Sequence, residues 1–189
     1  MASERSFTLS EIARRLDVPQ HRLIHLCEKG VIVPEIHDAA GRGSSRVFST
    51  GNFLELAVAL RLRDMMIPVS VVGAIVHVLR RFGQEVQEGL DGASLAESLR
   101  TPIAPELRII VSDGAAIYFS LVAPNEKARL FGGIPVKQLV GGGSEPDEPI
   151  PARRTHVVAG HHVFGGPEGS KFARMELSVT SIARSLPLE

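Results

Sequence analysis

The first half of the chain places apolar residues at the spacing of amphipathic helices. A polar lead at residues 1–6 is expected to fray, and a first apolar stripe follows within residues 9–16, where Ser10 is placed to accept an unpaired backbone N–H as the N-cap. After a turn at residues 17–18, Pro19 suits the first position of a second helix, since its missing N–H costs nothing there. This helix ends at Gly30, which readily adopts the left-handed conformation of a C-terminal cap. Two short helices joined by a tight turn predict a helix-turn-helix, a DNA-reading motif.

Two longer apolar segments follow in the sequence. Ser49 is predicted to cap a third helix, and Pro68 to start a fourth helix that reaches about residue 82. We expect Arg80-Arg81 at the end of the fourth helix, where cations interact favourably with the helix dipole; the alternative for this pair is a contact with phosphate. Residues 83–93 contain three glycines, so they cannot sustain the heptad repeat of a coiled coil.

The second half of the chain has the composition and period of strands. The segments expected to be strands are residues 107–112, 115–123, 128–131, 155–164 and 172–180. Between the first two, Asp113-Gly114 is a strong signal for a two-residue hairpin. Residues 172–180 alternate apolar and polar side chains, as in a sheet with one face in water. These features predict a small antiparallel β domain, interrupted by a Gly- and Pro-rich loop at 141–151.

The polar face of the second helix carries the candidate base-reading residues. Gln bonds bidentately to adenine and Arg to guanine, so Gln20 and Arg22 have suitable chemistry. His21 and His25 can donate to bases or phosphates, although an exposed His is more often an ordinary surface residue. Lys29 fits a contact with the DNA backbone.

The loop after this helix has a Gly-rich tip flanked by arginines. It can fold as a β-hairpin wing over about residues 41–48. Arg42 and Arg46 are candidate phosphate contacts because a guanidinium presents a fork that matches two phosphate oxygens, and Ser44 lies between them. The alternative is a solvated loop.

Residues 8 to about 82 resemble the N-terminal domain of the MerR family of transcription regulators. The resemblance is carried by residues 9–16, Leu23, Gly30-Val-Ile-Val-Pro34, Arg46-Val-Phe-Ser49, the apolar helix 53–66 and Ile67-Pro-Val-Ser-Val-Val72. It implies four helices with a wing, and DNA as the partner. Met66 stands where the family usually has Gly, and Ser45 where it has an aromatic residue. MerR relatives commonly continue into a dimerising coiled coil, so a dimer of this chain would need another device.

Composition and charge narrow the class of protein. The chain has 189 residues, 44% hydrophobic and 22% charged, which is typical of a globular protein. Its net charge is zero, but residues 1–81 hold 11 Lys/Arg against 8 Asp/Glu while residues 82–189 hold 10 against 13. This asymmetry has the sign expected if the N-terminal part of the chain binds DNA. The single Cys27 fits a reducing compartment, and no apolar segment is long enough to span a membrane, so we expect a cytoplasmic protein.

No catalytic or metal-binding arrangement is readable. His156, His161 and His162 are the only suggestive cluster, but adjacent residues on a strand point to opposite faces and cannot easily share an ion. The Gly pairs at 132–133 and 165–166 lack the Lys-Ser/Thr ending of a phosphate-binding loop. We therefore expect neither enzymatic activity nor a metal or other cofactor.

The sequence as a whole predicts an α+β protein with two domains. Residues 1–83 are expected to form the winged helix-turn-helix, 84–106 a linker with a short helix, and 107–189 the β domain. The leading hypothesis is a MerR-like, sequence-specific transcription regulator that binds double-stranded DNA as a homodimer. The β domain would dimerise, bind a small-molecule effector or contact a protein partner. The alternatives are a protein-binding regulatory module, such as an antitoxin or a phage adaptor, and an architectural or excisionase-like DNA binder.

Overall fold

The structure is a computed structural model that describes residues 5–36, 46–89, 94–112, 116–122, 129–135, 156–157 and 174–189. It is of the mixed α+β class, with six helices and two antiparallel sheets among these residues. The chain divides into two compact units, one formed by Met1–Arg100 with Ile182–Glu189 and the other by Thr101–Ser181. No helix in the described ranges has the length and apolar character needed to cross a bilayer.

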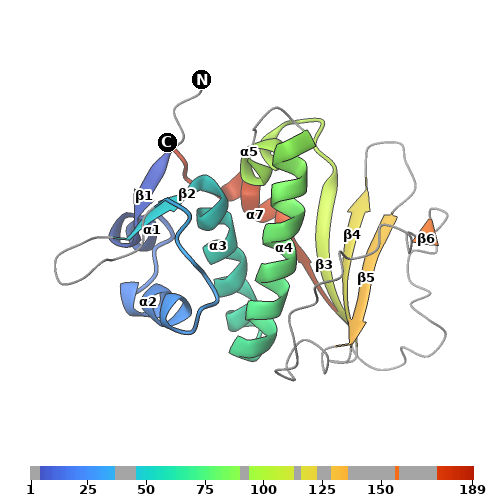
Figure 1. Cartoon of the computed structure of the whole chain (residues 1–189), viewed down its shortest axis with the longest axis horizontal. Helices are drawn as coiled ribbons and strands as arrows, with labels where there is room; N and C mark the ends of the chain where they lie inside the picture. The colour runs from blue at the N-terminus through green and yellow to red at the C-terminus, as the bar shows by residue number, and fades with distance from the viewer. Residues whose placement is uncertain are drawn as a thin grey trace. The chain divides into compact units, whose positions relative to one another are not determined.

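The first unit is mainly helical (Figure 1). Its elements are β1 (Ser6–Thr8), α1 (Leu9–Arg15), α2 (Gln20–Glu28), β2 (Val47–Ser49), α3 (Thr50–Asp64), α4 (Val69–Gly89) and α5 (Leu95–Arg100). The core is built on α3, in which Phe53, Leu56 and Val58 are fully buried. Both α4 and α5 pack against α3, and α2 packs against α1 and α3.

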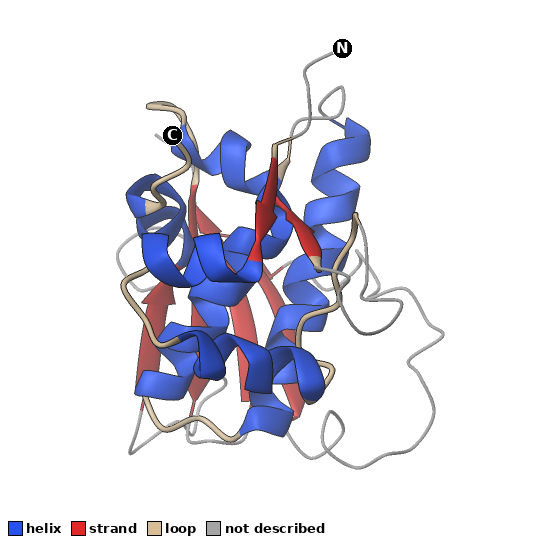
Figure 2. Cartoon of the chain, turned by 90° about the vertical axis from the view of Figure 1, so that its left-hand side faces the viewer, coloured by secondary structure: helices blue, strands red, loops and turns tan. Residues whose placement is uncertain are grey.

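The N-terminal segment is part of this unit. Figure 2 shows β1 and β2 as two short red strands among the helices, and they pair antiparallel with Phe7 opposite Phe48. Phe7 also meets Phe53 edge to face, with 5.1 Å between the ring centroids. The expectation that residues 1–6 fray is therefore wrong at Ser6, which lies in β1.

Three helices of this unit end in the same backbone motif. After α2, Gly30 has φ +68°, Val31 N–H donates to the Leu26 carbonyl and Gly30 N–H to the Cys27 carbonyl, which is a Schellman cap. The predicted cap at Gly30 is confirmed. At the ends of α1 and α3, Asp17 (φ 52°) and Met66 (φ 64°) occupy the equivalent left-handed position.

The N-terminal caps correct two predictions and confirm a third. Thr8, not Ser10, caps α1, since the Thr8 hydroxyl accepts the Glu11 N–H at 3.2 Å. Pro19 is the residue before α2 rather than its first residue. Ser49 caps α3 as predicted, accepting the Asn52 N–H at 3.0 Å.

The fourth helix is longer than predicted. It continues through Gly83 to Gly89, so the expected end near residue 82 is wrong. Gly83 lies where α4 faces α5, and a Cβ added there would be 3.6 Å from the Leu95 Cβ. Packing against α5 therefore stabilises the helical backbone at a residue of poor helix propensity. Ser94 and Glu97 form a reciprocal capping box that starts α5, a short helix within the range 84–106 where the sequence predicts one.

The second unit contains an antiparallel sheet of strand order β6-β5-β4-β3-β7. The strands are β3 (Glu106–Ser112), β4 (Ala116–Val122), β5 (Arg129–Pro135), β6 (His156–Val157) and β7 (Arg174–Ser178). Ile109 of β3 lies opposite Phe119 of β4 and Leu177 of β7, which aligns apolar side chains across the sheet. The hairpin tip predicted at Asp113-Gly114 and the loop at 141–151 lie outside the described residues.

The chain turns from β7 directly into α7 (Val179–Ser185). The strand predicted over 172–180 therefore ends two residues early, because Ser178 accepts the Ser181 N–H at 2.9 Å and caps the helix. The Thr180 hydroxyl accepts the Leu107 N–H at 2.8 Å and donates to the Pro105 carbonyl at 2.9 Å. These bonds hold the start of α7 beside the start of β3.

The C-terminal residues differ most from the predicted domain division. Residues 182–189, assigned from the sequence to the β domain, belong to the first unit, as does α5, which was assigned to a linker. The second unit is therefore an insertion between α5 and the C-terminal segment. Arg100 at the end of α5 donates to the carbonyls of Ala183 (3.1 Å) and Leu186 (2.5 Å), so the chain leaves and re-enters the first unit at neighbouring points.

A candidate nucleic-acid interface

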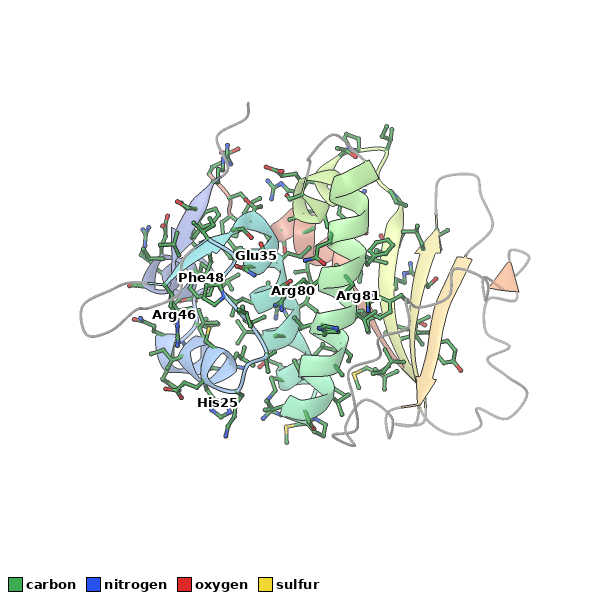
Figure 3. All side chains as sticks on the ribbon, in the orientation of Figure 1. His25, Glu35, Arg46, Phe48, Arg80 and Arg81 are labelled. Atoms are coloured by element: carbon green, nitrogen blue, oxygen red, sulfur yellow. The ribbon has the colours of Figure 1, made fainter. Side chains whose placement is uncertain are left out.

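The helix α2 has one buried and one solvent-facing side. Leu23 and Leu26 are 0% and 2% exposed and anchor the helix. The opposite side carries the exposed residues Gln20, His21, His25, Glu28 and Lys29. Figure 3 shows the side chain of His25 on the outer side of α2. The helix thus presents a polar, mainly cationic or titratable surface to solvent.

Arg22 differs from its exposed neighbours on α2. Its Nη2 lies 2.5 Å from Oδ1 of Asp64, the last residue of α3, and both side chains are partly exposed. The ion pair joins the first turn of α2 to the end of α3. Arg22, predicted from the sequence to contact a base, therefore has an intramolecular partner.

The predicted wing lies mostly outside the described residues, which include neither Arg42 nor Ser44. Arg46 is described: it is half-buried, directly precedes β2 and is not without an interaction partner. Its position is labelled in Figure 3. The strand that follows, β2, pairs with β1, so the N-terminal strand supplies a partner that the sequence did not suggest.

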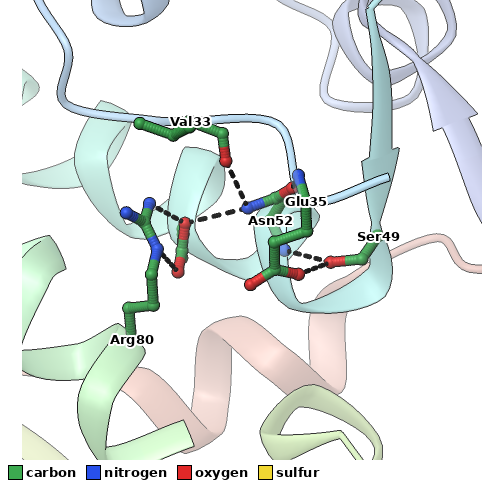
Figure 4. A network of polar contacts seen from close by, with 6 residues as sticks. Val33, Glu35, Ser49, Asn52 and Arg80 are labelled. Carbon is green, nitrogen blue, oxygen red and sulfur yellow. Dashed lines mark hydrogen bonds and ion pairs between the residues drawn. The ribbon is translucent and has the colours of Figure 1, made fainter. Parts of the chain in front are cut away.

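A polar network holds the two chain segments on either side of this loop (Figure 4). Asn52 of α3 accepts the Glu35 backbone N–H at 2.9 Å and donates to the Val33 carbonyl at 3.2 Å. The Ser49 hydroxyl donates to the Glu35 carboxylate while also capping α3. The exit from α2 and the start of α3 are thus joined through side chains at 35, 49 and 52.

The network continues into the buried interface between α3 and α4. Asn52 donates to Glu55 at 3.1 Å, and Arg80 of α4 donates from Nε and Nη2 to the two Glu55 oxygens at 2.8 and 2.6 Å. The Glu55 and Arg80 side chains are only 5% and 18% exposed. The predicted place of Arg80 at a helix terminus is wrong, because α4 continues past it and its guanidinium faces Glu55.

The electrostatics of this pair follow from its burial. Burial raises the pKa of the Glu55 carboxyl above its ordinary range, and the hydrogen bonds and charge of Arg80 oppose that rise. For Arg80, burial acts to lower the pKa, but hydrogen bonding and attraction to Glu55 outweigh it and the pKa is raised. We take the ion pair as charged near neutrality, since both oxygens are bonded by a guanidinium that stays protonated.

A second set of arginine contacts, which the sequence analysis missed, fixes the C-terminal segment to α1. Arg15 bonds Glu11 at 2.7 Å, lies over the Phe7 ring at 5.3 Å, and donates to the carbonyls of Pro187 and Glu189. Arg5 donates to the Leu188 carbonyl at 3.0 Å. Because the partners in the C-terminal segment are backbone carbonyls distant in sequence, no pattern of side chains predicts these contacts.

The residues considered for other chemistry form no assembled site in the described part of the chain. His156 lies on β6, and His161 and His162 are outside the described residues. Within the described ranges, no group of three or more His, Cys, Asp or Glu side chains is placed to hold a metal ion. Cys27 is half-buried on α2.

No protein-family model matches the chain, and no curated protein matches it.

Proposed function

We propose that this chain is a sequence-specific, DNA-binding transcription regulator of MerR-like type. In this proposal α1 and α2 form a helix-turn-helix, α2 (about residues 19–29) reads operator DNA in the major groove, and the loop at about 41–48 is the wing. The protein would act in the cytoplasm, associated with the nucleoid when bound.

The observation that carries the proposal is the two-sided character of α2. A helix anchored by Leu23 and Leu26 presents Gln20, His21, His25 and Lys29 to solvent. These side chains have the donors and acceptors that reach base edges and phosphates. The Schellman cap at Gly30 ends the helix, and the chain then runs into the loop proposed as the wing.

The polar network supports the proposal for the wing. Glu35 and Ser49, which flank the loop, are hydrogen-bonded to each other and to Asn52. A loop with such a fixed base can present Arg42, Ser44 and Arg46 to a phosphate backbone at a defined distance from α2. In the same proposal, the excess positive charge of residues 1–81 contributes the sequence-independent part of the affinity.

The homodimer is proposed because the small charge excess of one copy supplies too little affinity for DNA. One helix-turn-helix of modest charge binds weakly, so two copies reading half-sites about one helical turn apart would supply the missing affinity. We propose the second unit as the element that dimerises or receives an effector or a protein partner.

The test is selection of bound fragments from random duplex DNA, followed by a salt titration on the enriched duplex. We expect an inverted repeat and a binding constant that falls steeply with salt. Lys29→Ala should reduce the salt slope by about 0.9 if it contacts one phosphate. Arg184→Ala, which removes a positive charge from an exposed position of α7 in the same unit, is the control and should leave the slope unchanged. Failure to enrich any duplex, together with no binding at low salt, would rule out the proposed function.

A further inference from the structure

The pairing of Arg22 with Asp64 leaves part of the arginine free. The contact joins Arg22 Nη2 to a single oxygen, Asp64 Oδ1, at 2.5 Å. A guanidinium has five N–H donors in a rigid plane, so one contact to Asp64 leaves an edge of two parallel donors available. The Arg22 and Asp64 side chains are 35% and 47% exposed, so solvent, or a ligand in its place, can reach this edge.

Asp64 occupies a position that is unfavourable for a carboxylate on its own account. It is the last residue of α3, where the helix dipole disfavours negative charge, and the nearby Arg61 and Arg63 are the cations expected there. The contact with Arg22 offsets that cost. This hydrogen-bonded ion pair links α2, the proposed reading helix, to the end of α3.

The backbone that carries Asp64 is well fixed. The chain ends α3 in a Schellman cap, with Met66 N–H donating to the Arg63 carbonyl at 3.0 Å and Ile67 N–H to the Leu62 carbonyl at 3.1 Å. Leu62 and Ile67, which flank the cap, are buried. A carboxylate on such a turn can restrict the rotamers of the long, flexible Arg22 side chain.

We propose that Asp64 is a positioning residue, which holds the Arg22 guanidinium so that its free edge meets the O6 and N7 acceptors of a guanine. The inference rests on the proposed function and deepens it, because it names the base that this part of α2 reads and the residue that makes the reading selective. Without Asp64, Arg22 still attracts DNA through its charge but samples rotamers that also reach phosphates. Loss of Asp64 therefore lowers discrimination between base pairs more than it lowers affinity.

The experiment uses the full chain and the duplex enriched from the random library, with each base pair of the site substituted in turn. Arg22→Ala should lower the ratio of affinities for the G·C pair and its substitutes at one position of the site by about 10-fold or more. This is the discrimination that a bidentate contact supplies. Asp64→Asn should reduce the preference at that same pair by about 3- to 10-fold, while affinity for unrelated duplex stays equal or rises because a negative charge is removed. Asp64→Glu should restore part of the preference.

Two comparisons separate positioning from other roles. Glu11→Gln also removes a carboxylate that pairs with an arginine of the first unit, Arg15 at 2.7 Å, and should leave base preference unchanged. In a double-mutant cycle, Asp64→Asn should have no further effect on base preference when Arg22 is already alanine.

Additive effects of the two substitutions would overturn the inference. An Asp64→Asn variant that binds more tightly with its base preference intact would also overturn it, since Asp64 would then only compete with DNA for Arg22. If the wild type binds no duplex, the proposed function fails and this inference with it; if it selects a site that Arg22→Ala reads equally well, only the inference fails.

Discussion

Arg80 of α4 holds both carboxylate oxygens of Glu55 of α3, at 2.8 and 2.6 Å, inside the core of the first unit. Through Asn52, the same carboxylate is connected to the segment that leaves α2. Removal of one partner from a buried ion pair destabilises the folded protein, because the other charge is then left buried without compensation. The pair therefore couples the packing of α4 to the chain segments that flank the proposed wing.

Replacement of Arg80 should destabilise the protein strongly. Arg80→Met leaves Glu55 buried with only Asn52 as partner, and we expect the free energy of unfolding to fall by about 3 kcal/mol. Chemical denaturation followed by circular dichroism measures it. The neighbouring Arg81→Met, at a half-buried residue outside this ion pair, is the control and should cost about 1 kcal/mol or less. Equal losses for the two variants would show that the ion pair has no special role.

The raised pKa of Glu55 gives a pH dependence of defined sign. At a pH between the ordinary pKa of 4.5 and the raised folded-state pKa, the folded state holds a proton on Glu55 that the unfolded chain has released, and above the folded-state pKa the ion pair is charged. The stability contributed by this group is therefore full below the ordinary pKa and falls as the pH rises through the folded-state pKa, by about 1.4 kcal/mol for every pH unit that separates the two pKa values. Glu55→Gln lacks this group, so the stability of the wild type minus that of the variant should decline as the pH rises from 4.5. A difference that grows over this range would contradict the raised pKa.

The left-handed residue after α3 offers a stabilising substitution. Met66 has φ 64° and is 86% exposed, so its side chain contributes little while its Cβ strains the backbone. Met66→Gly should raise the free energy of unfolding by about 0.5–1 kcal/mol. At the preceding residue, with φ −83°, Met65→Gly should lower it by a similar amount. Thermal unfolding of the two variants separates this conformational effect from the loss of a methionine.

The C-terminal segment should be required for the first unit to be stable. Leu188 is 5% exposed and its carbonyl accepts from Arg5. Leu188→Ala should cost about 2–4 kcal/mol, the range for a buried leucine. Glu189→Ala, an exposed neighbour, should be nearly neutral. Hydrogen exchange at the α1 amides provides the readout, and unchanged protection in Leu188→Ala would show that α1 does not depend on the segment.

The parts of the fold that were predictable from the sequence are those set by local chemistry. Gly30 at a left-handed cap and Ser49 at an N-cap were predicted because each meets a steric or hydrogen-bonding need of the adjacent helix. The α+β class followed from the change of period between the halves. These signals need no knowledge of distant segments.

The errors arose where distant segments decide the structure. Gly83 suggested a helix end, but α5 packs against α4 there and the helix continues. Nothing in the local sequence marks residues 6–8 as a strand, but Phe7 pairs with Phe48. For the candidate site, the polar face of α2 was predictable from the sequence but the pairing of Arg22 with Asp64 was not. The sequence gives no sign that the start of α2 lies beside the end of α3.

The clasp between Arg100 and the carbonyls of Ala183 and Leu186 has a consequence for biosynthesis. Translation produces the whole inserted unit before residues 182–189, which complete the first unit. A nascent chain stalled within the insertion would thus display α1 without the segment that covers it. The first unit can therefore complete its packing only after the β unit has been made.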